Sequence, residues 1–175
     1  MNYNQTLMRR LKANDPGAFA YMGDVTQQKG EYNYAFMYWT KAAELGNINS
    51  QYNLSGLYFL GQGVEKDEKK ALYHLEEAAI GGHVEARHNL GRFEGENNGN
   101  MDIAFKHFTI AANMGHDKSL ELLKKNYANG FVTKDDFASA LRAHRAAVVA
   151  TISPQRKEAE AVRQIMTAAS AARQK

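Results

Sequence analysis

The chain has 175 residues, of which 44% are hydrophobic and 23% are charged, and its formal net charge is +3. This composition is typical of a folded protein and argues against wholesale disorder. The absence of cysteine excludes disulfides, thiolate zinc sites and cysteine nucleophiles. Pro16 and Pro154 are the only prolines, so long helices are possible along almost the whole chain.

The N-terminal residues 1–12 do not form a secretory signal. They lack an apolar run, and their basic residues Arg9 and Arg10 come near the end of the segment rather than at its start. No segment approaches the roughly 18 apolar residues that a membrane helix needs. We therefore predict a cytosolic or nuclear protein without membrane association. The excess positive charge lies in residues 154–175, which hold five basic and two acidic residues. The rest of the chain has equal numbers of basic and acidic residues, so the net positive charge is weak evidence for nucleic-acid binding, which needs a basic stripe along the body.

Along the chain, residues 1–14 are predicted to form an N-terminal capping helix. Asp15-Pro16 is a typical helix start, because the aspartate side chain can cap the helix and proline pre-sets its first φ angle. A pattern Ala-Ala-x-x-Gly then recurs three times, in Ala42-Ala43-Glu44-Leu45-Gly46, Ala78-Ala79-Ile80-Gly81-Gly82 and Ala111-Ala112-Asn113-Met114-Gly115.

The glycines of this pattern are 36 and 33 residues apart, a period typical of stacked helical hairpins. Each has an alanine 11 residues before it and a large apolar residue seven before it, namely Trp39, Leu75 and Phe108. These positions share one helical stripe. We expect the alanines to admit a neighbouring helix, the large residue to fill the space between hairpins, and glycine to end the helix in a left-handed cap.

The links between paired helices differ in length. Residues 61–67 supply two glycines for a turn and end at Asp67, a predicted helix cap, whereas residues 96–100 form a shorter link. Thr133 to Asp136 resembles a capping box before a final helix that runs to about Ala150. We predict repeats at 15–46, 47–82 and 83–115, a partial unit at 116–130, and capping helices with a basic tail at 131–175.

This arrangement resembles the SEL-one-like repeats (SLR), relatives of the tetratricopeptide repeats (TPR). The second unit carries most of the family pattern, in Leu54, Tyr58, Gly61-Gln62-Gly63-Val64, Asp67, Ala71 and the Ala78-Ala79 ending. Ser55 departs from it, since the family has glycine there. The resemblance implies an all-α, right-handed superhelix of helical hairpins that acts as an adaptor in protein assemblies. Relatives with a cysteine-rich zinc module are known, but this chain has no cysteine for one.

By analogy with the tetratricopeptide layout, the first helix of each hairpin lines a concave face. The resemblance then assigns a mixture of amide, aromatic and charged residues to that face, namely Asp24, Gln27, Asn49, Tyr52, Phe59, Glu85, His88, Arg92, Lys118, Glu121 and Lys125. Such a mixture suits an extended peptide, because amides bond its backbone and charges select its side chains. The alternative for each residue is a solvated helix face with no ligand.

The histidines form no predicted metal site. His74 and His107, like His83 and His116, are 33 residues apart, so each pair is one repeat position seen twice. Neighbouring repeats place such positions on the order of 10 Å apart, too far for one metal ion. We also find no nucleophile elbow and no recognised acid–base pair, and therefore predict neither cofactor nor catalysis.

We predict a monomeric, non-catalytic scaffold or adaptor that binds a protein or peptide in its concave groove. The alternative is a nucleic-acid-binding protein that uses the basic C-terminal helix. One side of that helix is apolar and consists of Ala159, Val162, Ile165 or Met166, and Ala169. We expect this apolar stripe to pack against Phe137, Leu141 and Val148 of the preceding helix.

Overall fold

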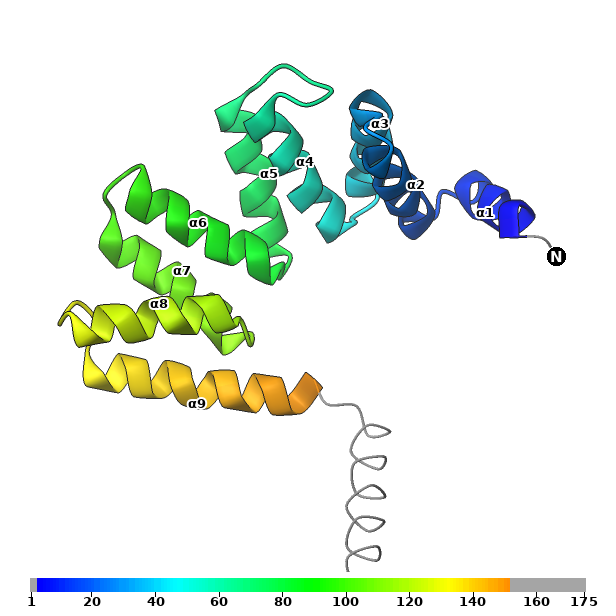
Figure 1. Cartoon of the computed structure of the whole chain (residues 1–175). Coiled ribbons are helices and arrows are strands. Elements are labelled where there is room, and N and C mark those ends of the chain that lie inside the picture. The colour runs from blue at the N-terminus through cyan, green and yellow to red at the C-terminus, as the bar shows by residue number, and fades with distance from the viewer. Residues whose placement is uncertain (1–2, 152–175) are drawn as a thin grey trace, which may run out of the picture. The chain divides into compact units, whose positions relative to one another are not determined.

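The computed structural model describes residues 3–151, and all regular structure within that range is α-helical (Figure 1). The all-α prediction is therefore confirmed. The helices are α1 (Tyr3–Lys12), α2 (Pro16–Gln28), α3 (Tyr32–Glu44), α4 (Ile48–Leu60), α5 (Glu68–Ile80), α6 (Val84–Glu96), α7 (Met101–Asn113), α8 (Asp117–Ala128) and α9 (Lys134–Thr151). The basic segment 154–175, with its proposed docking role, lies outside the described residues.

The helices pack as successive hairpins within two compact units, one ending at Ala111 and the other beginning at Ala112. In the first unit α2 packs on α3 and α4 packs on α5. Contacts of α3 with α4 and of α5 with α6 join one hairpin to the next. In the second unit α8 packs on α9. None of the helices between Tyr3 and Thr151 combines the length and apolar character needed to cross a membrane.

A glycine and the residue after it form each junction between hairpins. Gly46 and Gly82 have φ angles of +86° and +93°, a left-handed conformation that a residue with a Cβ adopts at a cost. The next residue, Asn47 or His83, donates its backbone N–H to the carbonyl of Ala42 or Ala78 at 2.9 Å. This is a Schellman motif, which satisfies carbonyls at the end of the preceding helix.

The same residue also begins the following helix. The Asn47 side chain accepts the backbone N–H of Ser50 at 2.9 Å, and the His83 ring accepts that of Ala86 at 3.2 Å. Asp15 caps α2 by accepting the backbone N–H of Gly17 at 2.8 Å. The residue after the glycine therefore closes the end of one helix with its backbone N–H and caps the start of the next helix with its side chain. The predicted caps at Asp15 and Asp67 are confirmed, the latter through the backbone N–H of Lys70 at 3.0 Å.

Small residues on the first helix of a hairpin receive the large residue of the second. A Cβ added at Gly23 would meet the fully buried Trp39 ring, and one added at Gly91 would lie 2.7 Å from the Phe108 ring. At the equivalent place in the second repeat, Ser55 is buried beside a hairpin partner that carries Leu75. Leucine is smaller than tryptophan or phenylalanine, so this hairpin has room for a serine Cβ.

The apolar core lies at the contacts between helices of the first unit. One cluster joins α3 to α4 through Ala35, Trp39, Leu54 and Leu57. A second cluster joins α5 to α6, and Tyr52 and Phe59 of α4 pack against it while only partly buried. These two aromatic residues therefore belong to the core on one side and to the surface on the other.

Gly91→Ala is expected to lower the free energy of unfolding by up to about 2 kcal/mol, because overpacking against Phe108 costs about 1–3 kcal/mol and better helix propensity offsets about 1 kcal/mol of it. Ser55→Ala, the matched control, removes only a hydroxyl that donates to the Tyr52 carbonyl at 2.7 Å and should change stability by less than about 1 kcal/mol. Urea unfolding followed by circular dichroism measures both. Equal stability of the two variants would contradict the proposed packing.

Candidate functional site

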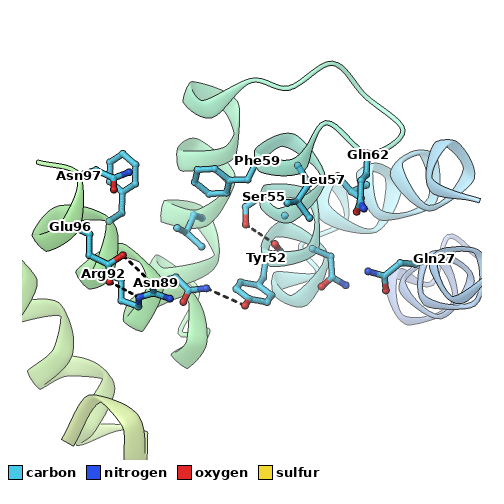
Figure 2. Close-up of a pocket in the computed structure, with 15 residues that line it drawn as sticks. Gln27, Tyr52, Ser55, Leu57, Phe59, Gln62, Asn89, Arg92, Glu96 and Asn97 are labelled. Carbon is cyan, nitrogen blue, oxygen red and sulfur yellow. Dashed lines mark hydrogen bonds and ion pairs between the residues drawn. The ribbon is translucent and has the colours of Figure 1, made fainter. Parts of the chain in front are cut away.

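The main candidate site is a groove with a cavity of about 540 Å³ in the first unit (Figure 2). Its walls come mainly from the first helices of three consecutive hairpins, α2, α4 and α6, with the turn after α4 and one residue of α5, Leu75. The lining residues are Gln27, Tyr52, Asn53, Ser55, Gly56, Leu57, Phe59, Leu60, Gln62, Leu75, Asn89, Arg92, Phe93, Glu96 and Asn97.

The polar part of this lining consists mainly of side-chain amides. Gln27, Gln62 and Asn97 make no side-chain hydrogen bond within residues 3–151. Asn89 donates to the Tyr52 hydroxyl at 3.2 Å and keeps its carbonyl oxygen available (Figure 2). Since an amide both donates and accepts, these groups match the N–H and C=O groups of a peptide backbone.

The charges of the groove neutralise each other. Arg92 and Glu96 are the charged residues in its lining, and the guanidinium donates to both carboxylate oxygens at 3.0 and 2.9 Å. This bond raises the pKa of Arg92 and lowers that of Glu96, so both remain ionised and paired. The groove therefore offers no uncompensated charge to a ligand.

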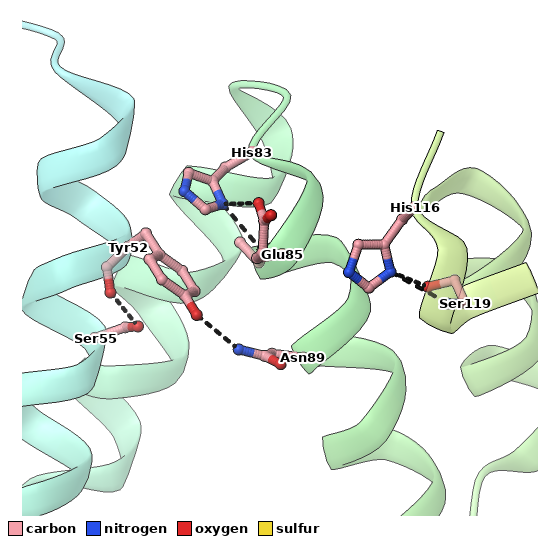
Figure 3. A network of polar contacts seen from close by, with 8 residues as sticks. Tyr52, Ser55, His83, Glu85, Asn89, His116 and Ser119 are labelled. Carbon is pink, nitrogen blue, oxygen red and sulfur yellow. Dashed lines mark hydrogen bonds and ion pairs between the residues drawn. The ribbon is translucent and has the colours of Figure 1, made fainter. Parts of the chain in front are cut away.

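Tyr52 is held in the groove wall by a ring stack and by a hydrogen bond to its hydroxyl. Its ring stacks on His83 with centroids 4.3 Å apart and an interplanar angle of 16°, and its hydroxyl accepts the bond from Asn89 (Figure 3). His83 caps α6 at the junction before that helix. The junction thus fixes an aromatic side chain that lines the groove.

Asp24 has a structural partner as well as an exposed position. Its carboxylate accepts the indole N–H of the fully buried Trp39 at 3.1 Å and lies 3.5 Å from the Asn53 amide nitrogen. These contacts join α2 to α3 and α4. Asp24 therefore satisfies a core donor beside the groove.

The structure brings part of the predicted set together. Gln27, Tyr52, Phe59 and Arg92 line the groove. His88 is buried, with 9% of its surface exposed, and its ring lies 5.5 Å from that of Phe108. Asn49 and Glu85 are exposed but do not line the groove, and the exposed residues on α8 belong to the second unit, namely Lys118, Glu121 and Lys125.

Sequence reasoning missed the amides Asn53 and Asn89. Both line the groove and lie 36 residues apart, at the same position of consecutive repeats. Their recurrence in register was the available signal. No such signal exists for three other lining residues, Gln62, Asn97 and Gly56. Whether they line the groove depends on the conformation of the turns after α4 and α6 and on how the neighbouring helices pack.

His83 and His116 are both helix N-caps. His116 accepts the backbone N–H of Ser119 at 3.2 Å, as His83 does for Ala86. The notion that these two histidines occupy one repeat position is thus confirmed, and the position is the N-cap. No group of three metal-binding side chains occurs among the described residues.

Asp24→Ala is expected to cost about 1–3 kcal/mol of stability, because it leaves the buried Trp39 N–H without its acceptor. Asp24→Asn keeps an acceptor oxygen and should cost less. The emission maximum of Trp39, the single tryptophan, reports the local change, and urea unfolding reports the global one. If both variants unfold like the wild type, Asp24 has no structural role.

The cap at His83 makes stability depend on pH. Burial lowers the pKa of His83, with the Glu85 carboxylate opposing it, and burial also lowers the pKa of His74 and His107. The unfolded chain, with histidine pKa values near about 6.5, then binds more protons than the folded one. Histidine-linked stability is therefore present above about pH 6.5 and is lost as the pH falls through the folded pKa.

We expect the wild type to lose stability between about pH 7 and pH 5, and His83→Asn to lose less, because an asparagine cap does not titrate there. Urea unfolding across this range measures the difference. NMR titration of the His83 ring supplies the direct check, and a pKa above that of free histidine would contradict the lowered pKa on which this prediction rests.

The chain is similar to known proteins along most of its described length. The family model for the Sel1 repeat matches residues 17–47, 48–83 and 84–116. A crystal structure of a Sel1 repeat protein from Oxalobacter formigenes has 24% identity and a TM-score of 0.66, over 81% of this chain and 62% of that one.

A protective antigen of uropathogenic Escherichia coli with an SLR fold, c5321, has 28% identity and a TM-score of 0.67, over 86% of this chain and 34% of that one. The immunity protein PA5088 from Pseudomonas aeruginosa has 18% identity and a TM-score of 0.59, over 82% of this chain and 59% of that one. The chain thus spans less than two thirds of each of these proteins. These matches confirm the helical-repeat fold, and with three repeats matched over more than half of its length, the chain belongs to the Sel1 repeat family.

Proposed function

We propose that the chain is a non-catalytic scaffold that binds a protein or peptide partner in the groove formed by α2, α4 and α6. The observation that carries this proposal is the groove itself, with side-chain amides left without partners in the described structure. Sel1 repeat proteins generally serve as protein–protein interaction scaffolds, which supports a partner of this class. We propose that the scaffold acts as a monomer in the cytosol or nucleus, as the sequence predicts.

The electrostatics of the groove support binding rather than acid–base chemistry. A general acid or base works best with a pKa near the operating pH. In the groove, the pKa of Glu96 is lowered and that of Arg92 is raised, so both move away from neutrality. The remaining polar lining groups are amides and hydroxyls, which suit recognition of a backbone.

The other exposed residues of the predicted set remain candidates for contacts beyond the groove. Asn49 and Glu85 lie near the starts of α4 and α6, while Lys118, Glu121 and Lys125 are exposed on α8. We propose that they add selectivity at the surface. Exposed charges of this kind act mostly on association rate and salt dependence.

Affinity capture from a lysate of the native host tests the groove. Gln27→Ala combined with Arg92→Ala is expected to reduce recovery of the bound partner by more than about tenfold, which corresponds to about 1.4 kcal/mol. The matched control is Gln28→Ala with Lys69→Ala, which also removes one amide and one cation, from exposed positions outside the groove. Quantitative mass spectrometry compares the captured proteins.

Both double variants should unfold like the wild type, because the groove pair removes only an exposed ion pair and a free amide. Equal recovery by the groove variant and its control would reject the groove as the binding site. Loss of the partner from both would show that capture depends on general surface contacts.

A further inference from the structure

The groove contains a glycine that the fold does not explain. Gly56 lies in the interior of α4, where glycine is the weakest helix former apart from proline. A Cβ added at Gly56 would meet no atom within 4 Å. Neither the backbone conformation nor a neighbouring side chain therefore requires glycine at this position.

Several other glycines of the first unit have a visible cause. Gly23 and Gly91 make room for Trp39 and Phe108, and junction glycines such as Gly82 have positive φ angles. Gly56 has neither feature, yet it lines the groove. Glycine without an internal cause is expected where another backbone approaches closely.

We propose that Gly56 is the point of closest approach for the bound partner, and that the partner segment there is an extended peptide without net charge. This inference rests on the proposed function, since it concerns the same groove. The missing Cβ lets the peptide backbone lie against α4, within reach of side-chain amides on both neighbouring helices.

The amides around Gly56 fit a peptide backbone. Asn53 comes from the same helix, Gln27 from α2 and Asn89 from α6, and all three line the groove. Gln27 has no side-chain partner within the described residues, and Asn89 uses only its amide nitrogen, on Tyr52. Gln27 and Asn89 lie on opposite sides of Tyr52 of α4, so donors and acceptors are available on both sides of that helix (Figure 2).

The charge of the groove selects an uncharged segment. Arg92 and Glu96 satisfy each other, so a charged peptide side chain would lose hydration without gaining a counter-charge. Phe59 and Phe93 supply apolar surface beside the amides. The favoured segment therefore carries an apolar side chain between residues that contribute mainly their backbone.

A random linear dodecapeptide library displayed on phage, selected on the immobilised full chain, supplies the probes. Enriched peptides are synthesised with a fluorescent label, and their dissociation constants are measured by anisotropy. We expect peptides with no net charge and an apolar anchor. Gly56→Phe should weaken their binding by more than about tenfold, and Gly56→Ala should weaken it less.

Gly95→Ala is the matched control, because Gly95 is also inside a helix but does not line the groove. Its added Cβ would make only ordinary contacts, at 3.4 Å from Ala104 and Met101. Both alanine variants should raise the melting temperature by about 2–4 °C through better helix propensity. Only Gly56→Ala should lose affinity, which separates binding from folding.

The outcomes distinguish the role of Gly56 from the proposed function of the groove. If the peptides bind Gly56→Phe as tightly as the wild type but lose affinity for the Gln27→Ala, Arg92→Ala variant, the groove binds peptides and the role of Gly56 is wrong. Enrichment of consistently acidic or basic peptides overturns the uncharged segment. If no peptide is enriched, or none responds to any groove substitution, the proposed function fails together with this inference.

Discussion

The junction between hairpins is the constraint on which the rest of this structure depends. A left-handed glycine ends one helix, and the next residue both closes the Schellman motif and caps the following helix. Two adjacent residues therefore set the angle and the phase of consecutive helices, without a flexible loop between them. The buried small residues three positions after the caps, Ser50 and Ala86, show the consequence. Each first helix starts with the same face toward the core, whatever the length of the link inside the hairpin.

The groove follows from this common phase. Because α4 and α6 begin in the same way, Asn53 and Asn89 at equivalent positions both reach the same lining. The residues that line the groove are not separate from the core, however. Phe59 and Tyr52 pack against the cluster around Leu75 while also lining the groove, and Asp24 holds the buried Trp39. Substitutions on this face therefore act on stability as well as on binding, and only residues without internal partners, such as Gln27, report on a ligand alone.

The sequence predicted local features well, but it predicted less well which side chains are buried between helices and which line the groove. Caps, glycine turns and the Ala-Ala-x-x-Gly endings depend on a few neighbouring residues, and the structure has them where they were expected. The departure at Ser55 is understandable only beside Leu75, which leaves space that Trp39 and Phe108 do not. His88 was assigned to the concave face but is buried, since a position at the edge of that face is decided by how deeply the next helix packs. The sequence gives no reason for glycine at position 56, because the role of a helical glycine depends on the atoms around it in the folded structure.

The histidine at the second junction, His83, shows how one residue can serve the fold and the groove together. Asparagine, which caps α4 at Asn47, is the better N-cap and is short enough to act only on the backbone. The imidazole of His83 makes the same bond to Ala86 and in addition presents a flat ring, on which Tyr52 stacks at 4.3 Å. An asparagine has no ring to supply that contact. The exchange therefore gives up some capping strength for a fixed tyrosine, whose hydroxyl then orients Asn89. Because a side chain held before binding loses less conformational entropy when a ligand arrives, this junction contributes to the preorganisation of the groove wall.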